Sequence, residues 1–191
     1  MFKTKILILG PQTCGKTTIA NYLSDASENI GEYRPTQGVR ILEFESNGLE
    51  INGKNVNAEV ELWDCSGDTK FKSCWPAIQK DASGVILICN PDDADQVNEL
   101  EEWYRNFVTK RGIRNGHVII FFHQKPDSAG SLDNLRLPAL LQSIQSVITN
   151  IEQDGEALRL EFNNFLCNVI AGQTEQRERL NSVSLLNNNS H

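Results

Sequence analysis

The amino-acid sequence predicts an α/β fold in which a doubly wound, mostly parallel sheet of six strands carries helices on both faces. The first observation is a phosphate-binding pattern, G-x-x-x-x-G-K-[ST]. Residues 10–17 match it, between a buried apolar run and a helical stretch. The second is the alternation of further apolar runs with amphipathic segments, the pattern of strands joined by crossover helices. In such folds ligands bind at the carboxyl ends of the strands, so we expect the site there.

The six strands are expected from the apolar pattern. Residues 5–9 form a continuous apolar run, whereas residues 39–45 and 56–63 alternate apolar with polar side chains, as an edge hairpin does. Two turn signals, Asn47-Gly48 and Asn52-Gly53, lie between these alternating segments. The remaining strands are expected at residues 85–89, 118–122 and 146–149.

Helices are expected behind the loop, at residues 17–26, and between the later strands. Residues 94–110 and 157–170 repeat apolar side chains at helical spacing, and a short helix is expected over residues 135–141. The two stripes consist of Val97, Leu100, Trp103, Tyr104 and Phe107, and of Leu158, Phe162, Phe165, Leu166 and Val169. We assign residues 1–172 to one domain and expect the polar residues 173–191 to form a disordered tail.

The composition excludes several functions. Of 191 residues, 39% are hydrophobic and 23% charged, which is typical of a soluble globular domain. The formal net charge of −7 argues against a nucleic-acid binder or a binder of anionic membranes. The five cysteines show no metal-ligand spacing, which fits a reducing intracellular compartment. No apolar run is long enough to span a bilayer.

The glycine-rich loop indicates a site for nucleotide phosphates. Its glycines let the backbone curl so that successive N–H groups point inward, and the following helix N-terminus adds positive potential. Lys16 is expected to reach the β- and γ-phosphates, and the Thr17 hydroxyl to bind Mg²⁺. A glycine turn before an ordinary helix is the alternative interpretation. The predicted phosphate-binding residues are Gly10, Pro11, Gln12, Thr13, Cys14, Gly15, Lys16, Thr17 and Thr18.

With this loop, two further stretches resemble the Ras-like small GTPases of the Rab branch over residues 3–172. Switch I of Rab proteins resembles Tyr33-Arg34-Pro35-Thr36-Gln37-Gly38-Val39, and the W-D-x-x-G that opens switch II resembles Trp63-Asp64-Cys65-Ser66-Gly67. The resemblance implies a P-loop NTPase fold of the Ras-like G-domain type, with GTP or GDP and Mg²⁺ as ligands.

The same resemblance implies roles for three residues. Thr36 would bind Mg²⁺ and the γ-phosphate, Asp64 would hold Mg²⁺ through a water, and the Gly67 amide would sense the γ-phosphate. Taken alone, a Pro-Thr turn and an Asp-x-x-Gly turn are the alternatives.

Recognition of the base is implied only in part. Where the family has N-K-x-D, whose aspartate bonds guanine, the chain has Gln124-Lys125-Pro126-Asp127. Lys125 and Asp127 are kept, but Gln124 replaces asparagine. The family's S-A-K motif would fall at Thr149-Asn150-Ile151, which scarcely matches. The resemblance therefore implies guanine binding with weakened selectivity, and a solvated loop after a strand is the alternative.

Two departures from the family predict slow turnover of GTP. The glutamine that orients the attacking water is replaced by Asp68, which is shorter and would face an anionic γ-phosphate. The third loop residue, glycine in most Ras relatives, is Gln12, whose bulk obstructs a catalytic side chain. Asp68 stays a candidate general base, although phosphoryl transfer depends more on positioning and charge neutralisation. Whether the chain acts as an enzyme is thus left open.

A narrower resemblance joins three runs, residues 35–44, 61–68 and 73–77, to the Rab-like GTPases of the intraflagellar transport B complex. It implies a subunit that docks onto the coiled-coil subunits of that complex. Its location would be the cytoplasm and the cilium or flagellum, including the basal body region. Rab proteins end in prenylated cysteines, whereas the last cysteine here is Cys167, within an expected helix. We therefore expect no direct lipid anchor, so that a protein partner localises the chain.

Three functions compete: a GTPase cycling as a Rab-type switch, a nucleotide-bound adaptor with slow turnover, and a P-loop kinase of small substrates. We favour the adaptor. A kinase of that type needs an arginine-bearing lid, and the segment placed to form one, residues 128–133, contains no arginine. Trp75 in switch II has two interpretations, an exposed aromatic anchor for a partner or a side chain packed under switch II.

Overall fold

The computed structural model describes residues 1–26, 34–126 and 135–188, the last six of these by their backbone alone. Its elements, in chain order, are β1 (Phe2–Leu9), α1 (Lys16–Leu23), β2 (Val39–Ile51), β3 (Lys54–Cys65), η1 (Thr69–Cys74), α2 (Trp75–Gln79), β4 (Gly84–Cys89), α3 (Ala94–Phe107), η2 (Thr109–Arg111), η3 (Asn115–His117), β5 (Val118–His123), η5 (Ala139–Leu141), β6 (Gln145–Thr149) and α4 (Ile151–Asn188), where η marks a 3₁₀ turn.

One sheet of six strands organises the chain, in the order β2-β3-β1-β4-β5-β6. Among the described strands β2 and β3 are antiparallel, and every other neighbouring pair is parallel. The hairpin turns at Asn52 and Gly53, whose φ angles of 51° and 73° suit a tight two-residue turn. Asn47-Gly48 lies instead at a bulge between Ser46 and Leu49. The predicted sheet with its edge hairpin is confirmed.

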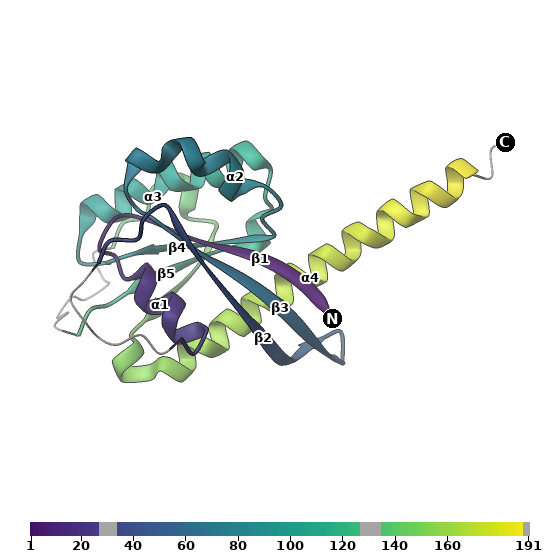
Figure 1. Ribbon diagram of the computed structural model, residues 1–191, viewed down its shortest axis with the longest axis horizontal. Helices are drawn as coiled ribbons and strands as arrows, with labels where there is room; N and C mark the ends of the chain where they lie inside the picture. Colours follow the sequence, from purple (N-terminus) through teal and green to yellow (C-terminus); the bar gives the residue numbers. More distant parts are fainter. Residues whose placement is uncertain (27–33, 127–134, 189–191) are drawn as a thin grey trace.

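Helices cover both faces of the sheet (Figure 1). Because side chains alternate along a strand, Ile8 of β1 packs with Ile19 of α1 and Leu166 of α4 on one face. Leu7 of the same strand packs on the other face, in the core that contains Phe107 of α3. The prediction of helices on both faces is therefore confirmed.

The predicted helical stripes lie in these two cores. Every member of both stripes, in α3 and in α4, is at most 6% exposed. Trp75 is buried as well, with its ring centroid 5.2 Å from that of Trp103 and 5.0 Å from that of Phe107. Of its two interpretations, packing under switch II is therefore confirmed, and the exposed anchor is wrong.

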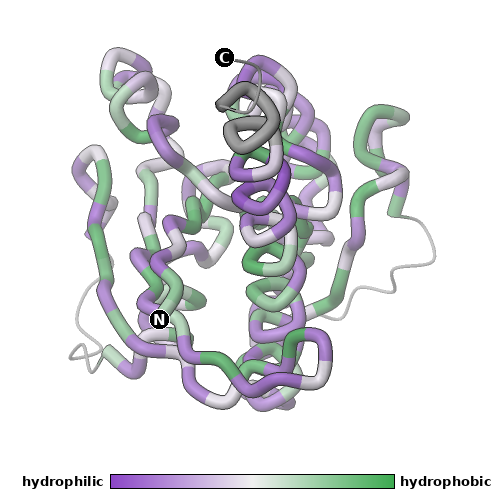
Figure 2. Tube along the Cα trace, turned by 90° about the vertical axis from the view of Figure 1, so that its right-hand side faces the viewer, coloured by the Kyte–Doolittle hydropathy of each residue, from purple (hydrophilic) through white to green (hydrophobic). Residues whose placement is uncertain are grey.

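The last helix, α4, differs most from its prediction. It begins at Ile151, is kinked at Asp154, and continues to Asn188. Residues 173–188 are thus helical, which corrects the expected disordered tail. Their Glu, Gln, Arg and Leu residues favour helix, and Gln173 bonds Thr4 of β1 at 3.3 Å and Ser83 at 2.8 Å. Beyond this tie the helix leaves the body of the protein, and its outer turns are mostly hydrophilic (Figures 1 and 2).

Two of the other helices span fewer residues than the sequence predicts. α1 ends at Leu23, where the hydroxyl of Ser24 turns back to bond the carbonyl oxygen of Ala20 at 2.8 Å. The helix expected over residues 135–141 is reduced to the single turn η5, which begins directly after Pro138. No described helix combines the length and the apolarity that crossing a membrane needs.

Candidate functional site

The loop between β1 and α1 has the backbone shape that a phosphate site needs. Gly10, Thr13 and Gly15 have positive φ angles of 147°, 59° and 97°. A Cβ on Gly10 would lie 2.1 Å from the carbonyl oxygen of Ile88 in β4, so no larger residue fits there. Among the residues that the structure describes, no side chain caps the N-terminal N–H groups of α1 at Gly15, which leaves these groups able to bind an anion.

Lys16 lies inside this loop. It is 6% exposed, its ammonium donates to the carbonyl oxygen of Pro11, and its Nζ lies 3.7 Å from the Cys14 sulfur. Burial raises the pKa of the Cys14 thiol, so the neighbouring sulfur stays neutral and leaves the charge of Lys16 uncancelled. The ammonium is therefore a buried cation that can exchange its present partners for phosphate oxygens.

Three polar side chains from separate segments meet beside the loop. The hydroxyl of Thr17, in the first turn of α1, donates to Oδ2 of Asp64 on β3 at 2.7 Å. Thr36, which precedes β2, has its Oγ1 3.1 Å from that of Thr17 and 3.5 Å from the same carboxylate oxygen. The structure thus brings together all three residues expected to bind Mg²⁺, whose metal role stays a prediction.

The carboxyl group of Asp64 is suited to a cation. It is fully buried, and burial raises its pKa, which the hydrogen bond from Thr17 and the charges of Lys16 and Arg40 oppose. Its Oδ1 has no hydrogen-bond partner within the described part of the chain. A buried oxygen in that state is unfavourable, and a water bound to Mg²⁺ would supply its donor. Two hydroxyls and one carboxylate fit Mg²⁺, which takes oxygen ligands and keeps several waters.

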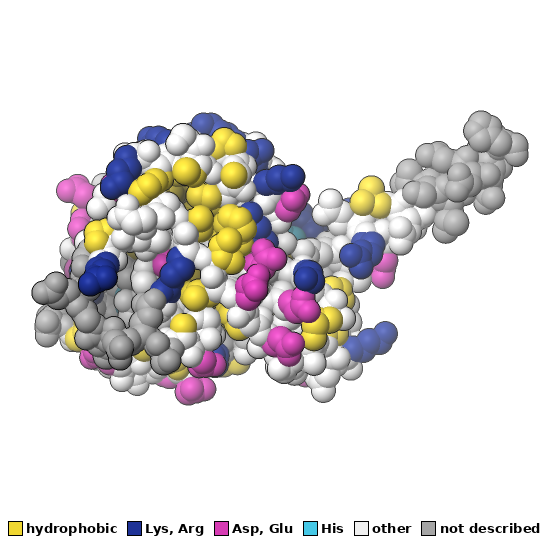
Figure 3. All heavy atoms as spheres, viewed as in Figure 1, with side chains coloured by type: hydrophobic (Ala, Val, Ile, Leu, Met, Phe, Trp, Pro, Cys, Tyr) yellow, Lys and Arg dark blue, Asp and Glu magenta, His cyan; other side chains and the backbone are white. Residues whose placement is uncertain are grey.

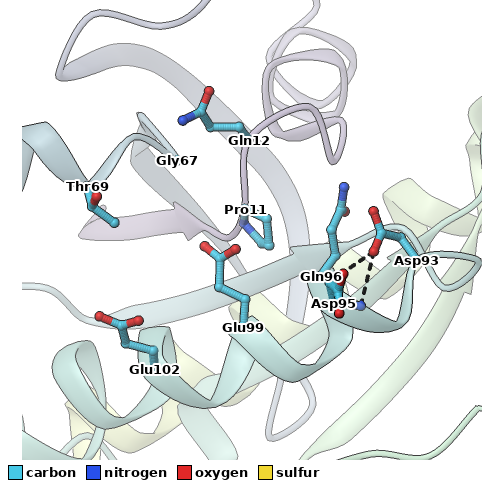
Figure 4. Close-up of a pocket in the computed structure, with 9 residues that line it drawn as sticks. All are labelled: Pro11, Gln12, Gly67, Thr69, Asp93, Asp95, Gln96, Glu99 and Glu102. Carbon is cyan, nitrogen blue, oxygen red and sulfur yellow. Dashed lines mark hydrogen bonds between the residues drawn. The ribbon is translucent and has the colours of Figure 1, made fainter.

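A cleft of about 540 Å³ opens between the loop, the segment after β3, and α3 (Figure 4). A Cβ on Gly67 would lie 2.5 Å from the amide nitrogen of Gln12 and 2.6 Å from the carbonyl carbon of Pro11. Only glycine permits this approach to the loop, which the predicted sensing role of the Gly67 amide requires. Gln12 lines the cleft with an exposed side chain, and Glu99 and Glu102 of α3 line it as well.

Asp68 is bound to its own segment. Its Oδ1 accepts from the backbone nitrogen of Lys70 at 2.9 Å, and its Oδ2 pairs with the ammonium of Lys70 at 2.9 Å. Asp68 thereby caps η1. These bonds lower the pKa of its carboxyl group, which makes it a weaker base. The arrangement argues against Asp68 as a general base.

The expected base-binding segment follows β5 at the same edge of the sheet. Gln124 is half-buried, and its backbone nitrogen donates to the carbonyl oxygen of Thr149 in β6 at 2.9 Å. Lys125 is exposed. Asp127, expected to bond guanine, lies outside the described residues. Asn150, where the S-A-K motif would fall, accepts bonds from two backbone nitrogens at the start of α4, so its side chain serves that helix.

Sequence reasoning misses two residues at this edge. His123 ends β5 under the loop, where a Cβ on Gly15 would lie 2.4 Å from its ring. Burial lowers the pKa of His123, which keeps the ring neutral at pH 7. Arg40 of β2 brings its Nε within 4.0 Å of Asp64 Oδ2. The signal for Arg40 in the sequence is its position, because it shares a face of the alternating strand with Leu42, a partly buried side chain that packs against the core.

The strand order and the meeting of two threonines with a strand aspartate beside a glycine loop define a Ras-like GTPase domain. The family described as "Ras of Complex, Roc, domain of DAPkinase" matches residues 5–127. Over 180 residues the chain is 46% identical to the intraflagellar transport protein 22 homolog of Danio rerio, covering 94% of this chain and 96% of that relative. The chain belongs to the intraflagellar transport protein 22 family of small GTPases.

Solved structures agree with this assignment. The GTP-bound crystal structure of T. brucei IFT22/74/81 superposes with a TM-score of 0.72 at 31% identity, covering 92% of this chain and 99% of that one. The GDP-bound T. brucei IFT22 gives 0.69 at 30% identity, covering 91% and 99%. The resemblance to Ras-like GTPases and to those of intraflagellar transport is thus confirmed.

Proposed function

We propose that this chain binds GTP and GDP with Mg²⁺ and serves the intraflagellar transport B complex as a nucleotide-dependent adaptor with slow or negligible hydrolysis. The observation that carries the proposal is the meeting of Thr17, Thr36 and Asp64 beside the phosphate-binding loop. Relatives crystallised with GTP and with GDP support the same ligands. We place this function in residues 1–172.

Each residue of the site has a role toward the phosphates. The backbone N–H groups of residues 10–18, apart from Pro11, which has none, bind phosphate oxygens, and the ammonium of Lys16 bonds the β- and γ-phosphates. Thr17, Thr36 and Asp64 would hold Mg²⁺, which when bound neutralises charge on the β- and γ-oxygens. The amide of Gly67 donates to the γ-phosphate, so the position of switch II follows the presence of that phosphate.

The base is assigned to the segment after β5. Asp127 accepts hydrogen bonds from guanine, each worth about 1.5–3 kcal/mol because the acceptor is charged. The stem of Lys125 covers the base, and Gln124 takes the place of the family's asparagine. Guanine is therefore preferred over adenine, with less support from neighbouring groups than in other Ras relatives.

Slow hydrolysis follows from the state of Asp68 and Gln12. The carboxylate of Asp68 is held by Lys70 and adds a negative charge near the γ-phosphate. Gln12 lines the cleft beside Gly67, where its bulk would obstruct a catalytic side chain. Intrinsic turnover is expected to be no faster than roughly 10⁻⁴ per second, the order of intrinsic hydrolysis by Ras.

Asp68→Gln should raise the single-turnover hydrolysis rate several-fold. The neutral amide of glutamine removes the repulsion between Asp68 and the γ-phosphate. The side chain is also one methylene longer, and without the ion pair to Lys70 it can orient a water. Asp68→Asn is the matched control, since it removes the same charge without gaining reach, and it should accelerate hydrolysis much less. Equal hydrolysis rates in Asp68→Gln and the parent chain would mean that Asp68 does not cause the slow hydrolysis. Gln12 would then be the first residue to test.

A partner surface lies beside the switches. Ile41 of β2 is 46% exposed and lies opposite the half-buried Trp63 of β3. The ring of the half-buried Phe71 lies 3.8 Å from where a Cβ on Gly38, just before β2, would stand. Figure 3 shows hydrophobic side chains gathered between α2 and the β2–β3 hairpin. Thr36 precedes β2 and Gly67 follows β3, the two strands that carry Ile41 and Trp63. Because both residues are proposed to contact the γ-phosphate, the shape of the surface would depend on that phosphate. A partner that binds this surface would therefore distinguish the GTP-bound from the GDP-bound form.

We assign that partner to the coiled-coil subunits of the intraflagellar transport B complex. A T. brucei relative crystallised as IFT22/74/81 in the GTP-bound form supports this. The chain would then be found in the cytoplasm and in the cilium or flagellum, including the basal body region. Its localisation would come from that protein partner, and the formal net charge of −7 argues against a nucleic-acid partner.

The second candidate is a Rab-type GTPase that cycles actively in intracellular transport. The specific observation in its favour is that T. brucei IFT22 has been crystallised in both nucleotide states. Single-turnover hydrolysis separates the two candidates, because an active switch turns over within its signalling time and the adaptor does not.

The proposed function predicts nucleotide-dependent assembly. Calorimetric titration of the coiled-coil subunits should show at least about tenfold tighter binding to the chain loaded with a non-hydrolysable GTP analogue than with GDP. Thr36→Ala should remove that difference, whereas Thr109→Ala, an exposed threonine on η2, should keep it. ATP should compete for the nucleotide site less well than GTP. Equal affinity of the GTP and GDP forms would leave nucleotide as a purely structural ligand.

A further inference from the structure

Arg40 occupies an unusual position for a charged residue. In the antiparallel register of β2 with β3 it lies opposite Asp64. It shares one face of β2 with Leu42 and Phe44, which pack against the core under α1 and α4. Placing a charge on that face is unfavourable unless the charge has partners. The position therefore calls for an explanation in terms of what Arg40 contacts.

The contacts of Arg40 join three elements. Its Nε lies 4.0 Å from Oδ2 of Asp64 on β3, and its terminal nitrogen donates to the side-chain oxygen of Asn21 on α1. The arginine side chain is 29% exposed, and that of Asp64 is 0% exposed. The guanidinium is thus held between α1 and the carboxylate assigned to Mg²⁺, on the edge strand that follows Thr36.

A cation in this place competes with a second cation. A guanidinium keeps its charge at every accessible pH. Charges a few ångströms apart interact strongly where protein shields them from water. Thr17 and Thr36 also direct their hydroxyls at Oδ2 of Asp64, so that oxygen is partnered from several sides without a metal. The Arg40 charge repels Mg²⁺ and attracts the phosphates, which have the opposite sign.

We propose that Arg40 is a resident counter-charge of Asp64 that weakens Mg²⁺ binding and retains nucleotide when Mg²⁺ is absent. The proposal rests on the proposed binding of nucleotide with Mg²⁺ at this site. Its consequence is that nucleotide release from this chain depends little on Mg²⁺. Removing the Arg40 charge should make nucleotide release depend more strongly on Mg²⁺, because that charge repels Mg²⁺ and attracts the phosphates.

The test measures dissociation of a fluorescent GDP analogue from the full chain, once in excess Mg²⁺ and once in excess EDTA. In Arg40→Gln the ratio of the EDTA rate to the Mg²⁺ rate should rise about tenfold, mostly through faster release in EDTA. The Mg²⁺ concentration at the midpoint between the fast release in EDTA and the slow release in excess Mg²⁺ should fall by a similar factor. Arg40→Met serves as a second neutral variant if Arg40→Gln is poorly folded.

Two controls separate charge from structure. Arg40→Lys keeps the charge and should keep the ratio near that of the parent chain. Arg105→Gln removes an equal charge from an exposed ion pair with Glu101 on α3, and should leave the ratio unchanged. An unchanged ratio in the folded neutral variants, or an equal rise in Arg40→Lys, would overturn the counter-charge. A parent chain that retains no nucleotide in either buffer would refute the proposed function itself.

Discussion

Lys16→Ala should lower the affinity for both GTP and GDP by at least about a hundredfold. The ammonium of Lys16 is a buried cation held inside the phosphate-binding loop. Charge-assisted hydrogen bonds to the β- and γ-phosphates contribute about 1.5–3 kcal/mol each, so their joint loss exceeds a hundredfold in the dissociation constant. Titration with a fluorescent nucleotide measures the effect directly.

The matched control for this prediction is Lys3→Ala. Lys3 lies on the same strand that leads into the loop, but it is exposed and pairs with Glu59 at 3.0 Å. Its removal should leave nucleotide affinity unchanged. Both variants should unfold near the midpoint of the nucleotide-free parent chain, so that a loss of binding is not a loss of fold. An undiminished affinity in Lys16→Ala would remove the phosphate-binding role of the loop.

Much of the fold could be predicted because its signals are local. The runs at residues 85–89 and 118–122 are entirely apolar, which suits strands covered on both faces, and β4 and β5 are buried throughout. The end of α4 could not be predicted in this way. Its apolar stripe stops at Ile170, and the helix continues through residues that favour helix without burying a face.

The site could be predicted where a motif fixes the backbone, as in residues 10–17, and less well where side chains meet across the fold. The tie between Asp68 and Lys70 depends on the local turn of η1, and the approach of Arg40 to Asp64 depends on the β2–β3 register. Neither geometry can be read from spacing. The sequence favours neither interpretation of Trp75, because α2 has only five residues, too few to show a periodicity.

Trp75→Ala should lower the free energy of unfolding by about 3–5 kcal/mol, the usual range for truncating a buried Trp or Phe. The indole is 8% exposed and packs at an angle against the rings of Trp103 and Phe107, so its loss leaves a cavity between α2 and α3. In a chain of this length the unfolding temperature should fall by roughly 6–20 °C. Trp75→Phe, which keeps an aromatic ring in the cluster, should lose clearly less.

Leu160→Ala is the surface control, because Leu160 is 60% exposed on α4 and its truncation should change stability by no more than about 0.5 kcal/mol. The Trp75 cluster anchors α2 to α3 on one face of the sheet, whereas Lys16 and Thr17 belong to α1, which packs on the other face. Well below the unfolding temperature, Trp75→Ala should therefore retain nucleotide while switch II loosens. A variant that unfolds at the parent midpoint yet binds the coiled-coil subunits less tightly would instead mean that the indole acts at the surface.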